Sequence, residues 1–96
     1  MDNSVLSEEE IYRKVAKIPM WILKGNLLTR ELVAPNFSAA LGIVFSIGVV
    51  AESLNHHPDI LIYGWNKIRV ETTTCDLGGL TELDFVLAQK IDELNF

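Results

Sequence analysis

The sequence predicts a two-layer α+β domain, in which a four-stranded antiparallel sheet carries three helices on one face in the order α-β-β-α-β-β-α. Three segments show the apolar spacing of helices, and two pairs of short strand-like runs lie between them. Each pair is joined by two or three residues that include glycine and asparagine, which indicates hairpins. With 96 residues, 49% of them hydrophobic, the chain is expected to form a single domain over residues 1–96.

The first helix is predicted from a capping box near the N-terminus. Ser7 can accept a hydrogen bond from an early amide of the helix, while the Glu10 side chain reaches back to the amide of Ser7. Ile11 and Val15 then continue one apolar face. The helix is therefore expected to end near Lys17.

Two hairpins are predicted, one before and one after the central helix. The first pairs residues 21–24 with residues 27–33 around Gly25-Asn26, two residue types that tolerate positive φ. The second pairs residues 60–63 with residues 67–74. In its second strand apolar residues and threonines alternate with mostly charged residues, so one face should be buried and the other solvated.

The central helix is expected to begin after the N-cap Asn36 and to cover residues 37–54. The 20 residues from Leu32 to Ala51 carry no charge, and this length would match a membrane span. Pro35 and Asn36 interrupt the run, however, and leave only about 15 residues for a continuous helix. A buried core helix is therefore favoured, and no membrane partner is expected.

The faces of the central helix are assigned by side-chain size. The large residues are expected to face the sheet: Phe37, Leu41, Val44 and Phe45. A stripe of small residues recurs every fourth position: Ser38, Gly42 and Ser46. Such a stripe allows close approach of a second helix, either inside the same chain or from another subunit. Contact between subunits is favoured, because so short a chain has few other elements to cover both faces.

The last helix is predicted after the Gly78-Gly79 breaker, with Thr81 as its cap. Its expected apolar stripe consists of Leu83, Val86, Leu87, Ile91 and Leu94.

The formal net charge of −5 argues against nucleic-acid and anionic-membrane partners but does not exclude a protein partner. The single Cys75 cannot form an internal disulfide, and no basic region followed by an apolar core opens the chain, so a cytoplasmic location is expected.

The stretch from Glu52 to Asp59 carries the candidate chemistry. His56 and His57 fall at the C-terminal end of the central helix, because Pro58 disfavours helical geometry at the residue before it. Imidazole titrates near neutral pH, so a pair can share the duties of acid and base. The alternative is two solvent-exposed imidazoles that only cap the helix.

Glu52, His56-His57-Pro58, Trp65 and Asp84 have the spacing of a known signature, and the chain resembles the pterin-4a-carbinolamine dehydratase family over roughly residues 8–94. The resemblance implies the fold given above, with subunits assembled into homodimers or homotetramers. It also implies a hydro-lyase that removes water from 4a-hydroxytetrahydropterin to give quinonoid dihydropterin, in the recycling of tetrahydropterin. No metal or organic cofactor is implied.

The resemblance also assigns residue roles. His56 would be the principal acid and base, His57 would bind and orient the pterin, and Glu52 would hold His56 in its working tautomer. Cys75 stands where the family usually carries a third histidine, and because a thiol is a weak donor this departure is expected to weaken catalysis. Further substrate contacts are expected from Pro58, Asp59, Trp65, Thr74 and Asp84.

Several alternatives stay open at this point. Trp65 could be a core aromatic at the hairpin, and Asp84, three residues after Thr81, could serve only as a helix cap. The whole chain could be a family member that has lost catalysis and acts as a protein-binding dimerisation or assembly cofactor. Zinc binding is the least favoured reading, although the chain offers ligand types in Glu52, His56, His57 and Cys75.

Overall fold

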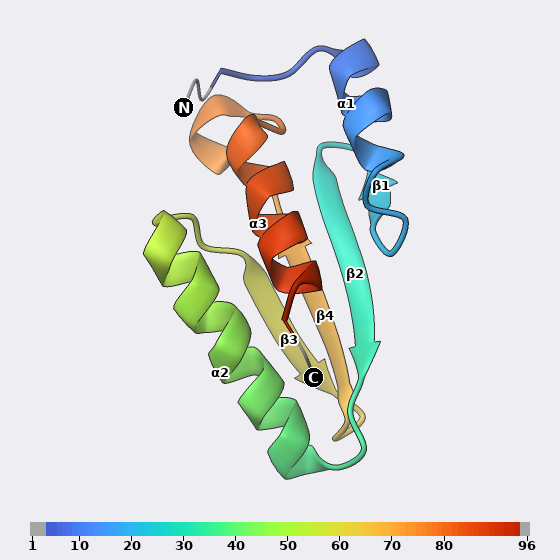
Figure 1. Cartoon of the computed structure of the whole chain (residues 1–96), viewed down its shortest axis with the longest axis vertical. Coiled ribbons are helices and arrows are strands. Elements are labelled where there is room, and N and C mark those ends of the chain that lie inside the picture. The colour runs from blue at the N-terminus through green and yellow to red at the C-terminus, as the bar shows by residue number, and fades with distance from the viewer. Residues whose placement is uncertain (1–3, 95–96) are drawn as a thin grey trace.

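The computed structural model describes residues 4–94 and confirms the predicted fold class (Figure 1). Its helices are α1 (Glu8–Val15), α2 (Phe37–Leu54) and α3 (Glu82–Asp92), and a short 3-10 helix, η1 (Cys75–Leu77), precedes α3. Its strands are β1 (Ile22–Lys24), β2 (Leu27–Val33), β3 (Asp59–Tyr63) and β4 (Lys67–Thr72). They form one antiparallel sheet in the order β1-β2-β4-β3.

The two layers meet at the inward face of the sheet. Ile68, Val70 and Thr72 of β4 are buried there, as the alternation in the sequence predicts. Figure 1 shows α2 and α3 side by side across this face, with α1 near β1 and the start of β2. The helix α1 buries none of its residues completely, but Ile11 and Val15 pack against the same core.

The outward face of the sheet carries charged and aromatic side chains. Glu31 on β2 accepts hydrogen bonds from the Tyr63 hydroxyl at 2.6 Å and from Arg69 Nε at 2.8 Å. The Tyr63 hydroxyl, followed by the Arg69 guanidinium, lowers the pKa of Glu31. The solvated face predicted for the second hairpin is therefore confirmed.

Both hairpins form where the sequence predicts them. Gly25 takes φ +55° in the first turn, and Gly64 and Trp65 take φ +54° and +60° in the second. A bulky residue rarely adopts the left-handed region, and Trp65 does so at the tip of the turn with 61% of its surface exposed. Trp65 is therefore not the core aromatic that was one of its two readings.

Four element bounds differ from the expectation. The strand β1 begins at Ile22 instead of residue 21, and β3 begins at Asp59 instead of residue 60. The helix α1 ends at Val15, two residues before Lys17, and β4 ends at Thr72, whereas the predicted strand ran to residue 74. Beyond β4, Thr74 forms an isolated bridge with Gly79, and η1 fills the short loop between them. This excursion brings the end of β4 against the first turn of α3.

The expected facing of α2 is wrong. The buried face consists of small and β-branched residues, namely Ala40, Ile43, Ile47 and Ala51. Val44 is half-buried at the edge, whereas Phe37, Leu41 and Phe45 point to solvent, with 74% of Phe45 exposed. Small side chains let the helix axis approach the sheet and α3 closely, and the sequence alone does not say which of two apolar faces does so.

By length and composition alone, α2 could cross a membrane, with a mean hydropathy of 1.9. In the structure one face of α2 lies against the sheet and α3, but only 22% of the helix is buried, so the expectation of a buried core helix is confirmed only for that face. In α3, Leu87 and Ile91 of the predicted stripe are buried, whereas Leu83, Val86 and Leu94 are half-buried. The buried face of α3 also contains Asp84, Phe85 and Ala88.

Candidate active site

The site begins where α2 ends. Asn55 adopts the left-handed conformation (φ 50°, ψ 42°), its amide bonds to the Glu52 carbonyl, and the His56 amide bonds to the Ala51 carbonyl, both at 3.1 Å. This pair of bonds is a Schellman motif, which stops the helix and reverses the chain. The backbone itself thus caps the helix, and the two imidazoles that follow leave it in different directions.

His56 turns inward and pairs with Asp84. Its Nε2 lies 2.6 Å from Asp84 Oδ1, the histidine side chain is 11% exposed, and the carboxylate is fully buried. The two-exposed-imidazole alternative is therefore wrong for His56. Asp84 comes from the first turn of α3, so this contact joins the end of α2 to the start of α3.

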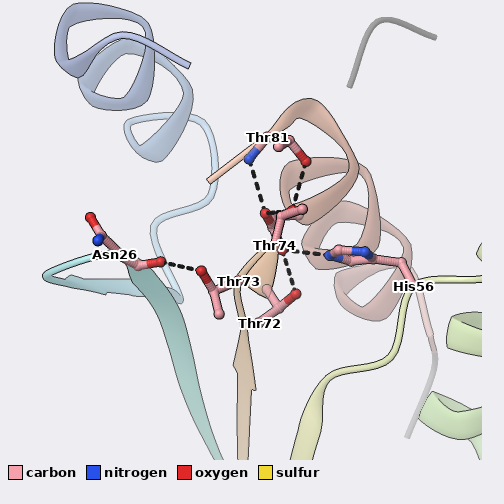
Figure 2. Close-up of polar contacts among 7 residues, drawn as sticks. Asn26, His56, Thr72, Thr73, Thr74 and Thr81 are labelled. Carbon is pink, nitrogen blue, oxygen red and sulfur yellow. Dashed lines mark hydrogen bonds and ion pairs between the residues drawn. The ribbon is translucent and has the colours of Figure 1, made fainter. Parts of the chain in front are cut away.

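The Asp84 carboxylate has three further partners. Its Oδ1 accepts from Thr72 Oγ1 at 2.7 Å, and its Oδ2 accepts from Thr74 Oγ1 at 2.7 Å and from the Thr81 amide at 3.0 Å. Figure 2 shows Thr72, Thr74, Thr81 and His56 gathered around this centre. The capping role read from the sequence is real, and the same carboxylate also holds the histidine.

Glu52 pairs with the other histidine. Its Oε1 lies 2.8 Å from His57 Nε2, and the two side chains are 78% and 63% exposed. The expectation that Glu52 holds His56 is thus corrected. It assumed that residues four apart share a helix face, but the helix ends at Leu54 and the turn at Asn55 moves His56 off that face.

A cavity of about 200 Å³ lies beside the two imidazoles. Cys75, exposed at the start of η1, lines it together with His56, His57 and Thr74. The remaining lining residues are Asn55, Thr73 and Asp76. Four of the predicted site residues therefore meet at one hollow, and Asp84 lies behind His56 and orients it from the protein side.

Three residues that were predicted to contact the substrate do not line this cavity. Asp59 is on the outward face of the sheet, paired with Glu71 across the β3–β4 ladder, and lines a different, smaller hollow. Trp65 is at the opposite end of β3 and β4 from the histidines. Pro58 is half-buried between His57 and β3 and does not line the cavity.

The sequence analysis did not identify Thr72 as a partner of Asp84. It also did not predict that the Thr81 amide donates to the Asp84 carboxylate. The signal was present, because Thr72 at the end of β4 and Thr74 just beyond it are both buried, and a buried hydroxyl without a partner is costly. Within residues 4–94, no three of the His, Cys, Asp and Glu side chains are grouped to hold a metal ion. Carboxylates from two separate elements take one histidine each.

A larger hollow, of about 410 Å³, lies between the end of β2 and α2. It is lined by Val33, Pro35, Ala39, Gly42, Ile43 and Ser46. These residues offer no titratable group, so general acid and base chemistry has no place there. The smaller histidine-lined cavity is the candidate active site.

Comparison with known proteins places this geometry in a family. Residues 4–94 match the family described as Pterin 4 alpha carbinolamine dehydratase. Relatives from Sulfurisphaera tokodaii and Chloroflexus aurantiacus, provisionally named as pterin-4-alpha-carbinolamine dehydratases, are 44% and 46% identical over 89 residues, which is 93% of this chain and 95% of each relative.

Two solved structures share the fold. A transcriptional coactivator/pterin dehydratase from Brucella melitensis has a TM-score of 0.84 at 30% identity, over 93% of this chain and 96% of that chain. A pterin dehydratase-like protein described as a RuBisCO assembly factor has a TM-score of 0.59 at 16% identity, over 75% and 82% of the two chains, and that likeness concerns the fold alone. The match over nearly the whole length shows that this chain belongs to the pterin 4 alpha carbinolamine dehydratase family.

Proposed function

We propose that this chain removes water from 4a-hydroxytetrahydropterin and releases quinonoid dihydropterin. The observation that carries the proposal is His56, held on the buried Asp84 at the wall of a cavity that His57 and Cys75 also line. In the reaction, the bond from C4a to the hydroxyl oxygen breaks, that oxygen leaves as water after gaining a proton, and a ring nitrogen loses a proton. One acid and one base are therefore sufficient, and the reaction needs no redox partner.

His56 takes the principal acid and base role in this proposal. Its Nε2 is committed to Asp84, so Nδ1 is the ring nitrogen through which a proton passes to or from the substrate. His57 stands on the exposed rim, where its contact with Glu52 steadies it for binding and orienting the pterin. A flat bicyclic ring would lie between His57 and Cys75, with Thr74 behind it.

The direct test is a dehydration assay on freshly generated 4a-hydroxytetrahydropterin, followed by the absorbance of the quinonoid product. Catalysed loss of water, above the spontaneous rate and proportional to protein concentration, is expected. A rate equal to the spontaneous one at micromolar protein would reject the enzymatic proposal.

Replacing Cys75 by histidine is expected to raise the dehydration rate. A neutral thiol is a weak hydrogen-bond donor with a reference pKa near 8.5, whereas an imidazole both donates and accepts near pH 7. Because one acid or base group contributes about 10²–10⁴-fold, a gain of at least about tenfold in kcat is expected. Cys75→Ser is the matched control and should show no such gain, and an unchanged Cys75→His rate would show that this position is not limiting.

Protein binding is the second candidate function. The observation that favours it is the apolar face of α2, which the chain leaves exposed. Two structural neighbours bear names that include a coactivator and a RuBisCO assembly factor. If the wild type shows no dehydratase activity and Cys75→His gains none, protein binding would be favoured over catalysis.

We also propose that the exposed face of α2 is covered by α2 of a second copy, giving a homodimer or, with further contacts, a homotetramer. Residues 32–51, which include most of α2, carry no charged side chain. Charge repulsion between two copies, each with a net charge of −5, would therefore not act within the contact itself. A cytoplasmic location completes the proposal, since the single cysteine is unpaired and exposed.

A further inference from the structure

The buried threonines around Asp84 contribute to the function of the site. We infer that Thr72 and Thr74 are positioning residues, whose hydroxyls hold the Asp84 carboxylate in one orientation and thereby keep the hydrogen of the neutral His56 ring on Nε2. Neither is assigned a catalytic role, because each acts through Asp84. The inference deepens the proposed dehydration and rests on it for its kinetic consequence, whereas its structural consequence stands independently.

The hydrogen-bond capacity of the carboxylate is filled. Each oxygen accepts two bonds, from Thr72 and His56 on Oδ1 and from Thr74 and the Thr81 amide on Oδ2, all between 2.6 and 3.0 Å. The Thr81 amide can only donate, and the two hydroxyls rotate to donate as well. Four donors on two oxygens leave the carboxylate little freedom to turn, so its orientation toward His56 is fixed.

The arrangement restricts His56. With Asp84 as the acceptor, the 2.6 Å contact places a hydrogen on His56 Nε2, whether the ring is neutral or charged. Proton exchange with a ligand in the cavity is then confined to Nδ1. If one hydroxyl were lost, the carboxylate would have an unfilled lone pair and freedom to turn, and the neutral ring would populate both tautomers.

Thr73, between the two inward-facing threonines, provides a control. Alternation along the chain turns Thr72 and Thr74 inward, while the Thr73 side chain between them donates to the Asn26 carbonyl at 2.5 Å. Figure 2 shows Thr73 directed to Asn26, away from the other threonines. A change at Thr73 removes a hydroxyl of the same type from the same segment without touching Asp84.

The test compares Thr72→Val, which keeps the shape and removes the donor, with Thr72→Ser, which keeps the donor. The first readout is the nitrogen-15 NMR spectrum of the His56 ring without ligand. Wild type and Thr72→Ser are expected to show a single tautomer protonated on Nε2, and Thr72→Val a mixture. Thr73→Val changes a residue that lines the cavity but does not contact Asp84, so it should keep the single Nε2-protonated tautomer of His56.

The second readout is kinetic. Loss of a hydrogen bond to a charged group is expected to lower kcat of Thr72→Val about 10- to 100-fold. The KM should stay within about twofold, because Thr72 does not line the cavity. Thr72→Ser should recover most of the wild-type kcat, which a purely structural role for the side chain would not require.

The outcomes separate the two proposals. If wild type shows no dehydration, the proposed function fails, and the NMR comparison still decides the role of the threonines. If Thr72→Val keeps both the His56 tautomer and the wild-type kcat, the inference is overturned. Should Thr72→Val fail to fold, Thr74→Val and Thr74→Ser provide the same comparison on Oδ2, with the NMR spectrum as the deciding measurement.

Discussion

Replacing His56 by alanine is expected to lower kcat for pterin dehydration by about 10²–10⁴-fold, because the variant loses the acid and base group that Asp84 orients. The chain should still fold, with a loss of about 1–3 kcal/mol in unfolding free energy, since the buried Asp84 loses one of four donors and keeps three. Single-turnover kinetics and urea unfolding measure the two effects separately.

His57→Ala is the matched control for this prediction. His57 is an imidazole adjacent in sequence that lines the same cavity, but its partner Glu52 is exposed and no buried group depends on it. Its removal is expected to raise KM more than it lowers kcat and to leave the unfolding free energy within about 0.5 kcal/mol of wild type. A larger loss of kcat in His57→Ala than in His56→Ala would exchange the roles given to the two histidines.

The parts of the fold that depend on neighbours in the sequence were predictable. The capping box at Ser7, the N-cap at Asn36 and the glycine turn at Gly25 all involve groups within a few residues of each other, and each forms as expected. The alternation in β4 likewise identified its buried face. Such signals fix elements and their order, because local geometry decides them.

The parts that depend on distant groups were not predictable in the same way. A helical spacing of four suggested that Glu52 holds His56, but one residue in the left-handed conformation at Asn55 redirected the ring to Asp84, 28 positions later. The resemblance identified Asp84 as a site residue, and its capping position was evident. Only the packing of α3 against the end of β4 shows that one carboxylate serves both purposes.

The largest departure from the sequence-based expectation, the facing of α2, leads to the prediction about assembly. Successive large residues four apart form a ridge on the exposed side: Phe37, Leu41, Phe45 and Val49. The small residues Ser38, Gly42 and Ser46 form a row beside it, and a Cβ placed on Gly42 would meet no atom within 4 Å. The row of small residues forms a groove beside the ridge. When two copies are related by a two-fold axis, the ridge of one copy can fill the groove of the other.

If two copies pair through α2 as proposed, Phe45→Glu is expected to make the protein monomeric at micromolar concentration. Burial of each large side chain contributes about 1.5–3 kcal/mol, and a carboxylate in the contact would lose that contribution and add the cost of desolvation. Light scattering after size exclusion measures the mass, with Tyr12→Glu on α1 as the control for an exposed aromatic replaced by a charge. Gly42→Leu should dissociate the copies without any charge, by filling the groove. A monomeric wild type, or a Phe45→Glu variant of unchanged mass, would show that another partner covers this face, and recovery of the wild type only with detergent would indicate lipid.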